Sequence, residues 1–249
     1  MLDGGHARRD FLRAGAGWGL LCLAELVVSR DALAGVAKEH ASQLLRAARD
    51  LGAQLRAGQL SATAWQSKMA NVFANVDVAR LARAIDLDRL LATAPKVSRG
   101  ASVVNVKQSI PNAVPGAVVK VFAFEQGRAN PPHAHDNMVS MHLVLRGRFR
   151  VRHFDRVRDA ARYIDVRPTL DRRLKPGELT TISDQRDNVH WHVAESRGVL
   201  LDILLTGVRR AGPRTTTHLI DPDRATALPN GLLRAPRIKS VKQALARYG

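Results

Sequence analysis

Short β-rich runs separated by turn residues dominate the chain after Pro95. The runs are rich in Val, Ile, Leu and Phe, and Gly, Pro, Asp or Arg residues stand between them. Several short strands at this spacing are typical of a β-sandwich or a β-barrel. We therefore expect a mainly β chain, with strands over 102–106, 117–124, 139–145, 149–154, 163–166, 179–182, 188–194 and 199–205.

The region before Pro95 follows a helical pattern instead. Apolar residues recur at three- and four-residue intervals from Leu44 to Leu55, which predicts a first helix. Ser61 and Asp77 are predicted to cap a second and a third helix. We expect the apolar stripes of these helices to be packing surfaces, which could cover a barrel mouth, seal a sheet edge or form a dimer contact.

The N-terminus indicates export. Ala7–Arg13 contains two arginines, one further residue, Phe-Leu and a basic residue, which resembles a twin-arginine signal. An apolar stretch, Ala14–Val28, follows, and then Ala32–Ala34, which has the small-x-small form of a cleavage site. We expect residues 1–34 to be removed and the mature protein to be periplasmic or secreted. Cys22, the single cysteine, lies in this segment, so the mature chain would have no disulfide.

These patterns divide the chain into four parts. They are an export signal over 1–34, a helical extension over 35–95, a β-barrel over 96–210 and a tail over 211–249. The tail is rich in Pro, Arg and Thr and ends in a predicted helix from Ser240 to Arg247.

The chain is strongly basic, with a formal net charge of +17 and a pI of about 11.3. The arginines are scattered and aromatic residues make up 4% of the chain, which argues against a nucleic-acid partner. The positive charge favours a small anionic molecule as the ligand. No apolar run approaches the roughly 18 residues that a membrane-spanning helix needs.

Histidines at two distant places predict a metal site. His133 and His135 alternate in a predicted extended segment, so both can face one point, and His190 comes from a later strand. Three neutral imidazoles suit iron, zinc, copper or nickel better than magnesium or calcium. We expect these three residues to be metal ligands.

The spacing of these residues resembles the cupin superfamily. The first cupin motif is His-x-His, four residues, Glu, six residues and Gly, and it is matched by His133, His135, Ser140 and Gly147, with Ser140 in place of Glu. The second motif is similar to Pro176-Gly177-Glu178 followed by His190. The resemblance covers about residues 100–206 and implies a single cupin jelly-roll barrel.

Within the cupins, three histidines without the glutamate resemble the thiol dioxygenases, which oxidise cysteine, cysteamine or N-terminal cysteine. The similar segments are 132–147, 187–190 and 199–204, whereas the Pro-Pro-Tyr of some members is replaced by Leu205-Thr206-Gly207. The resemblance implies Fe(II) as the cofactor, O2 as a substrate and a small thiol or similar anionic molecule as the other substrate.

Three further residues are candidates for catalysis. His142 lies two positions after Ser140, and His192 lies two positions after His190, so each can share the inner face of its strand. Asp202 lies in an apolar run, where an unpaired carboxylate would be costly. The alternatives are core histidines with satisfied hydrogen bonds and a structural ion pair.

Two other classes of function remain open. The barrel could belong to a non-catalytic protein that binds or senses a small ligand, since one fold serves many functions. It could also hold zinc, manganese or nickel and catalyse an isomerisation or a hydrolysis.

Overall fold

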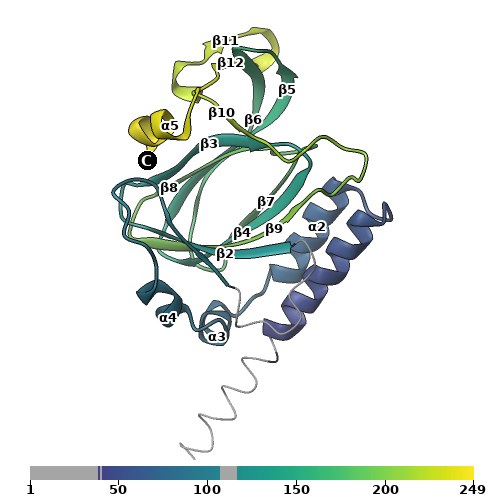
Figure 1. Cartoon of the computed structure of the whole chain (residues 1–249), viewed down its shortest axis with the longest axis vertical. Helices are drawn as coiled ribbons and strands as arrows, with labels where there is room; N and C mark the ends of the chain where they lie inside the picture. Colours follow the sequence, from purple (N-terminus) through teal and green to yellow (C-terminus); the bar gives the residue numbers. More distant parts are fainter. Residues whose placement is uncertain (1–38, 40, 107–116) are drawn as a thin grey trace, which may run out of the picture.

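The computed structural model describes residues 39, 41–106 and 117–249 (Figure 1). The predicted export signal and Cys22 therefore lie outside the described residues. None of the helices within these ranges is long and apolar enough to cross a membrane.

Eight consecutive strands, β2 to β9, form a two-sheet jelly roll. They are β2 (Ala117–Phe124), β3 (Ala129–His135), β4 (Met138–Arg146), β5 (Phe149–Asp159), β6 (Tyr163–Leu174), β7 (Leu179–Ser183), β8 (Val189–Ala194) and β9 (Gly198–Thr206). One sheet contains the order β2-β9-β4-β7 and the other the order β3-β8-β5-β6. This pattern, in which the chain passes back and forth between two antiparallel sheets, is that of a jelly roll. The predicted mainly β fold is confirmed.

Each predicted strand has an observed counterpart, and β3, which carries His133 and His135, is a further strand outside the predicted list. The first predicted run corresponds to β1 (Ser102–Asn105), which pairs with β2 at the edge of the barrel. Strands β5 and β6 are longer than their predicted runs because they continue together as one hairpin, in which Phe149 faces Leu174 and Asp159 faces Ile164.

The two faces of β4 have different surroundings. Val139, Met141 and Leu143 lie on the outer face, in one buried cluster with residues of the helices. Ser140 and His142 alternate with them and face the barrel interior, as the two-residue period of a strand requires. Strand β4 is buried on both faces. Its outer face is apolar, and its inner face carries Ser140 and His142 between Met138 and Val144.

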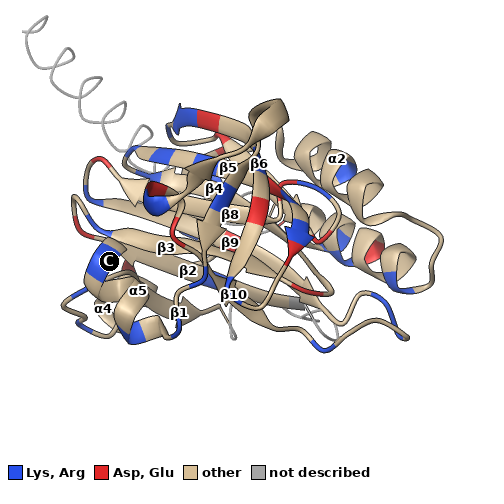
Figure 2. Cartoon of the chain, turned by 90° about the horizontal axis from the view of Figure 1, so that it is seen from above, with Lys and Arg blue, Asp and Glu red and all other residues tan. Residues whose placement is uncertain are grey.

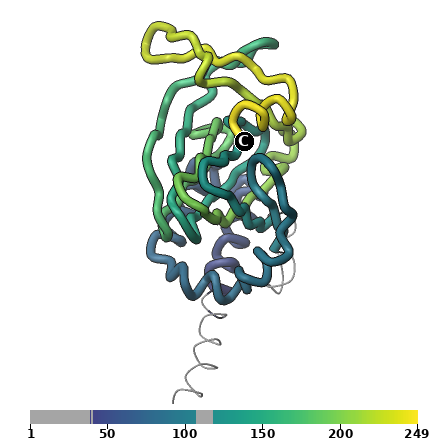
Figure 3. Tube along the Cα trace, turned by 90° about the vertical axis from the view of Figure 1, so that its left-hand side faces the viewer, coloured from purple at the N-terminus to yellow at the C-terminus, as the bar shows by residue number. Residues whose placement is uncertain are grey.

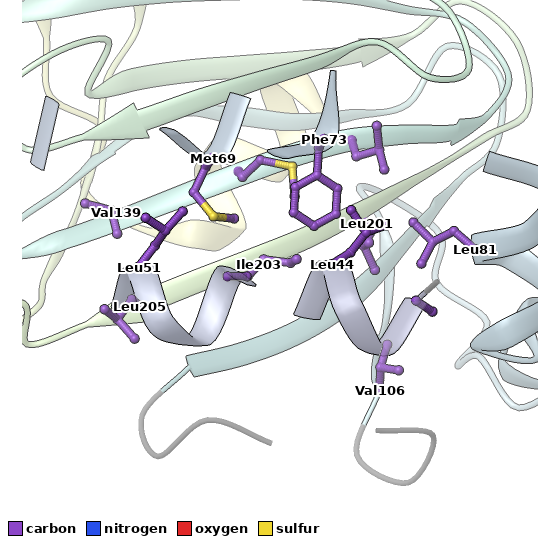
Figure 4. Packing of buried hydrophobic residues seen from close by; sticks show 14 of the residues in the cluster. Leu44, Leu51, Met69, Phe73, Leu81, Val106, Val139, Leu201, Ile203 and Leu205 are labelled. Atoms are coloured by element: carbon purple, nitrogen blue, oxygen red, sulfur yellow. The ribbon is translucent and has the colours of Figure 1, made fainter. Parts of the chain in front are cut away.

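The helical extension packs on the outer face of the β4-containing sheet (Figure 1). It consists of a helix over 41–56, α2 (Ala62–Phe73), α3 (Val78–Ala84) and α4 (Leu87–Ala92). Figure 4 shows Met69 and Phe73 of α2 beside Leu201 and Ile203 of β9. Both α2 residues have no exposed surface, so the apolar stripe of this helix is a packing surface.

The predicted caps are present. The hydroxyl of Ser61 accepts a hydrogen bond from the backbone of Ala64, and the carboxylate of Asp77 accepts one from the backbone of Arg80. Leu81, Ile85 and Leu90 recur at helical spacing after Asp77, but they do not form one helix, because Asp86 has a left-handed backbone with φ of 50° and separates α3 from α4.

Residues after 210 take part in the second sheet. Strand β10 (Thr217–Leu219) pairs with β3, and β12 (Leu233–Pro236) pairs with β6 and with β11 (Thr226–Ala227). Helix α5 (Val241–Tyr248), capped by Ser240, packs Tyr248 against Trp191 on the outer side of β8. This C-terminal segment and the N-terminal helices lie on opposite sides of the barrel (Figures 1 and 3).

Basic residues are distributed over helices, strands and loops (Figure 2). Many of them pair with carboxylates, for example Arg150 with Asp171 at 2.7 Å and Arg234 with Asp165 at 2.8 Å. The high positive charge is therefore spread over the molecule and partly neutralised at close range.

Candidate metal centre

Strand pairing brings the three predicted metal ligands together. His133 on β3 lies directly opposite His190 on β8, and His135 is two residues further along β3 on the same face. The ring centre of His133 is 4.1 Å from that of His190 and 4.7 Å from that of His135. The ring centres of His135 and His190 are 5.5 Å apart. One ring nitrogen of each residue lies within 4.8 Å of the other two, so the group can hold a metal ion.

Two prolines before the first ligand fit an irregular point in the sheet. The pairing of β3 with β8 changes register between Asn130 and His133, and Pro131 and Pro132 stand in this interval. Proline has no backbone donor, so it is tolerated where the hydrogen-bond ladder is interrupted. The sequence Pro-Pro-His thus places His133 immediately after a break in the ladder.

Each of the three histidines has an oxygen beside its Nδ1 atom. Nδ1 of His133 lies 2.7 Å from the carbonyl oxygen of Pro131, and Nδ1 of His190 lies 3.1 Å from that of Asn188. Nδ1 of His135 lies 3.2 Å from the hydroxyl oxygen of Thr217. The two carbonyl oxygens can only accept, so they assign the proton of His133 and His190 to Nδ1 and leave Nε2 with a free lone pair, which is the usual second-sphere arrangement of metal-binding histidines. The hydroxyl of Thr217 can accept from Nδ1 of His135 in the same tautomer.

Burial keeps these imidazoles neutral. It is the main cause that lowers the pKa of His133, His135 and His190, and the neighbouring histidines lower the pKa of His135 and His190 further. A neutral imidazole is the form that binds a metal ion. Three neutral nitrogen donors fit a divalent transition metal, and their geometry does not decide which one.

Asn188 fixes the backbone of His135. Its side-chain amide donates to the carbonyl oxygens of His135 at 2.8 Å and Ser183 at 2.9 Å, and its side-chain oxygen accepts from the backbone of His135 at 3.2 Å. Its own carbonyl is the acceptor for His190. One buried asparagine therefore connects two of the three candidate ligands.

A polar network joins β10 to the end of β3. Asp136 accepts hydrogen bonds from Arg156 at 2.7 Å, from Nε2 of His218 at 2.6 Å and from the hydroxyl of Thr216. Burial favours the protonated form of Asp136, but these three hydrogen bonds outweigh it and hold its pKa well below the usual value. The network anchors β10, and with it Thr217, beside the metal-binding strand.

Ser140 and Asp202 form a pair outside the three-histidine group. The hydroxyl of Ser140, at the position where the cupin motif has Glu, donates to the carboxylate of Asp202. Burial raises the pKa of Asp202 to about 7, opposed in part by Ser140 and by the charge of Lys120. Among the described residues, the metal-binding group contains no carboxylate.

His142 and His192 lie deeper in the barrel. The ring centre of His142 is 5.2 Å from that of His190 and 4.6 Å from that of His192. Nε2 of His142 is 3.8 Å from Asp202, too far for a hydrogen bond. Burial is the main cause that lowers the pKa of His142 to about 3, and it also lowers that of His192. The rings of His142 and His192 are therefore neighbours of His190, and Asp202 is a neighbour of His142; all three residues are buried.

Two residues of the site were not anticipated from the sequence. His153 on β5 lies opposite His190, with ring centres 6.5 Å apart; the alternation of Phe149, Val151 and His153 in a predicted strand is the signal that places it on the inner face. Thr217 comes from the predicted tail over 211–249, and no local pattern marks it.

Comparisons with known proteins give distant similarities. No protein-family model matches the sequence, and no curated protein matches it. The chain is similar to the structure of KdgF from Halomonas sp., with 20% identity over 47% of this chain and 89% of that chain and a TM-score of 0.34. It is also similar to a cupin superfamily protein from Desulfitobacterium hafniense DCB-2, with 14% identity over 45% of this chain and 84% of that chain and a TM-score of 0.32, and to an oxalate oxidase, with 19% identity over 47% of this chain and 58% of that chain and a TM-score of 0.35.

Proposed function

We propose that this protein is a metal-dependent oxidoreductase, a non-haem Fe(II) dioxygenase that acts on a small thiol or a similar anionic substrate. The observation that carries the proposal is the composition of the centre: His133, His135 and His190 present three neutral nitrogens, and the described group contains no carboxylate. Three neutral ligands leave the full double positive charge on the ion, which favours an anionic substrate.

For a thiol the reaction balances without a further reductant. A thiolate and O2 give a sulfinate, so that two sulfur–oxygen bonds form, the O–O bond breaks and sulfur supplies the four electrons that oxygen accepts. A ferrous ion held by the three histidines would supply the redox chemistry toward oxygen and a cationic binding point for the thiolate.

The chain itself contributes orientation and a dry environment. Pro131, Asn188 and Thr217 hold the ligand rings in one orientation through their Nδ1 atoms. Asp202, with a pKa of about 7 raised by burial, can take up or release a proton near neutral pH. His142 is near both groups, with Nε2 3.8 Å from this carboxyl group and its ring centre 5.2 Å from that of His190.

Metal analysis followed by oxygen uptake tests the proposal. Protein reconstituted with iron is expected to hold about one ion per chain and to consume O2 with at least one member of a panel of small thiols. The variant His190→Ala is expected to lose iron, whereas His142→Gln, outside the three-histidine group, keeps it. Iron retention by His190→Ala contradicts the ligand set, and ligand binding without oxygen uptake favours a carrier or sensor.

We also propose that the protein is exported by the twin-arginine route. The proposal rests on Arg8 and Arg9 followed by Phe11-Leu12 and a basic residue. When the full-length sequence is expressed, the protein is expected in the periplasm or medium with residues 1–34 removed. The double variant Arg8→Lys, Arg9→Lys is expected to stay in the cytoplasm and to keep these residues. Fractionation and N-terminal sequencing check this, and equal export of the double variant contradicts it.

A further inference from the structure

Four buried side chains inside the barrel carry a polar atom without a hydrogen-bond partner in the part of the chain that the structure describes. These atoms are Nδ1 of His142, Nε2 of His153, Oγ1 of Thr180 and Nε2 of His192. Each of the four residues is 7% exposed or less. Buried polar atoms in native proteins are nearly always paired with protein, water or a ligand, so a group of unpaired ones needs an explanation.

These four residues, which we call the inner polar layer, come from four strands and are neighbours across the interior. Thr180 on β7 lies directly opposite His142 on β4. The ring centre of His192 on β8 is 4.6 Å from that of His142 and 6.3 Å from that of His153 on β5. His142 and His153 are also within 5.2 and 6.5 Å of the metal-binding His190.

An apolar cluster lies beyond the inner polar layer. Val144 follows His142 on the inner face of β4, and Val151 precedes His153 on β5; both belong to a buried cluster with Phe149, Leu174 and Leu200. The interior therefore changes from the metal-binding histidines to the inner polar layer and then to apolar core. A molecule bound at the metal centre and extending inward would meet these polar atoms before it met the core.

We propose that the inner polar layer binds a hydroxyl group of the substrate, on the end of the molecule opposite to the anionic group at the metal centre. The substrate class is thus a small thiol or acid that also carries a hydroxyl group. The proposal rests on the proposed function only in assuming that one end of the substrate binds at the metal centre.

The chemistry of the layer favours a hydroxyl group over a charged one. A neutral imidazole and a threonine hydroxyl can each donate or accept a hydrogen bond, and a hydroxyl group does both. A second anionic group would need a cation inside the layer. Lys120, opposite Asp202 in the strand pairing, acts on that carboxyl, and Arg172, whose charge reaches His153, is exposed and donates to the carbonyl oxygen of Leu179. A cationic group would be disfavoured by the positive charge of the protein and of the metal.

Two pairs of isosteric probes test this without oxygen chemistry. In each pair a terminal hydroxyl is replaced by a methyl group: 2-mercaptoethanol with 1-propanethiol, and 3-hydroxypropionate with butyrate. Binding is measured by calorimetry under argon to full-length protein loaded with Zn(II), so that the readout does not depend on turnover. Wild-type protein is expected to bind the hydroxyl member of at least one pair tenfold or more tightly.

The variants His153→Phe and Thr180→Val each remove one unpaired atom and keep the size of the side chain. We expect either variant to lose most of the preference for the hydroxyl member while binding the methyl member as wild type does. Trp65→Phe is the matched control: it removes a buried, unpaired ring nitrogen from α2, on the outer face of the sheet, and should leave the preference unchanged.

The outcomes separate this proposal from the proposed function. Three outcomes overturn the assignment of the inner polar layer. They are equal affinity within both pairs, no binding of any probe, and a preference for the hydroxyl member that remains in both His153→Phe and Thr180→Val. A preference that is present in wild type and lost in the variants supports it, even if the iron-loaded protein consumes no oxygen, in which case the dioxygenase proposal alone fails.

Discussion

The hydroxyl oxygen of Thr217 lies 3.2 Å from Nδ1 of His135, although 82 residues separate them. The pairing of β10 with β3 places the two residues directly opposite each other. The last part of the chain thus supplies a contact to the candidate metal centre that the cupin-like motifs do not contain.

Replacing Thr217 by Val is expected to weaken metal binding. The methyl group cannot form the hydrogen bond with Nδ1, so the orientation of the ring is less well fixed, and losses of about 10- to 100-fold are usual for such second-sphere changes. Competition with a chelator measures the affinity. Thr217→Ser, which keeps the hydroxyl, should bind as wild type does, and equal affinity for Thr217→Val would show that the contact has no role in positioning.

Asn188→Ala is expected to affect stability and metal binding together. It removes the four hydrogen bonds that a side chain only 2% exposed makes with the backbone of His135 and Ser183 and with Arg156, and it leaves the backbone N–H of His135 unpaired. Each buried group left without a partner costs about 1–3 kcal/mol. Urea unfolding and chelator competition measure the two effects, with Asn71→Ala on the exposed side of α2 as the control. Unchanged metal affinity with reduced stability would limit Asn188 to a structural role.

Asp202 is expected to make folding stability depend on pH between about 4 and 7. Burial raises its pKa from the ordinary value of 3.8 to about 7 in the folded protein, so the folded state binds the proton more tightly than the unfolded state. The contribution is therefore present below pH 4 and is lost as the pH rises through 7, with a limiting slope of about 1.4 kcal/mol per pH unit.

The variant Asp202→Asn tests this sign. Its stability relative to wild type should increase as the pH rises from 4 to 8, because the amide does not ionise. Urea unfolding of metal-free protein at several pH values gives the difference. A difference that is constant with pH, or that decreases, would show that Asp202 is ionised in the folded protein across this range.

The parts of the site that the sequence could predict are those with local periodicity. The alternation of His133 with His135, and the position of His190 in a predicted strand, determine which face each ring occupies, and pairing of β3 with β8 then brings the rings together. Thr217 could not be found in this way, because its role depends on the register of β10 against β3. The short strands after residue 210 are paired and positioned by tertiary contacts rather than by their own propensity.

Phe73→Ala is expected to reduce stability and leave the metal centre intact. Phe73 has no exposed surface and packs, on the outer face of the sheet, in the cluster that contains Leu201 and Ile203, whereas the histidines lie on the inner faces of the strands. Truncating a buried Phe costs about 3–5 kcal/mol, while Val157→Ala, at a side chain that is 46% exposed, should cost less than about 0.5 kcal/mol. Urea unfolding measures both, and metal content is determined in conditions where the variant is still folded. Loss of metal from folded Phe73→Ala protein would mean that the helical layer sets the geometry of the centre through the sheet, and that the two faces are not independent.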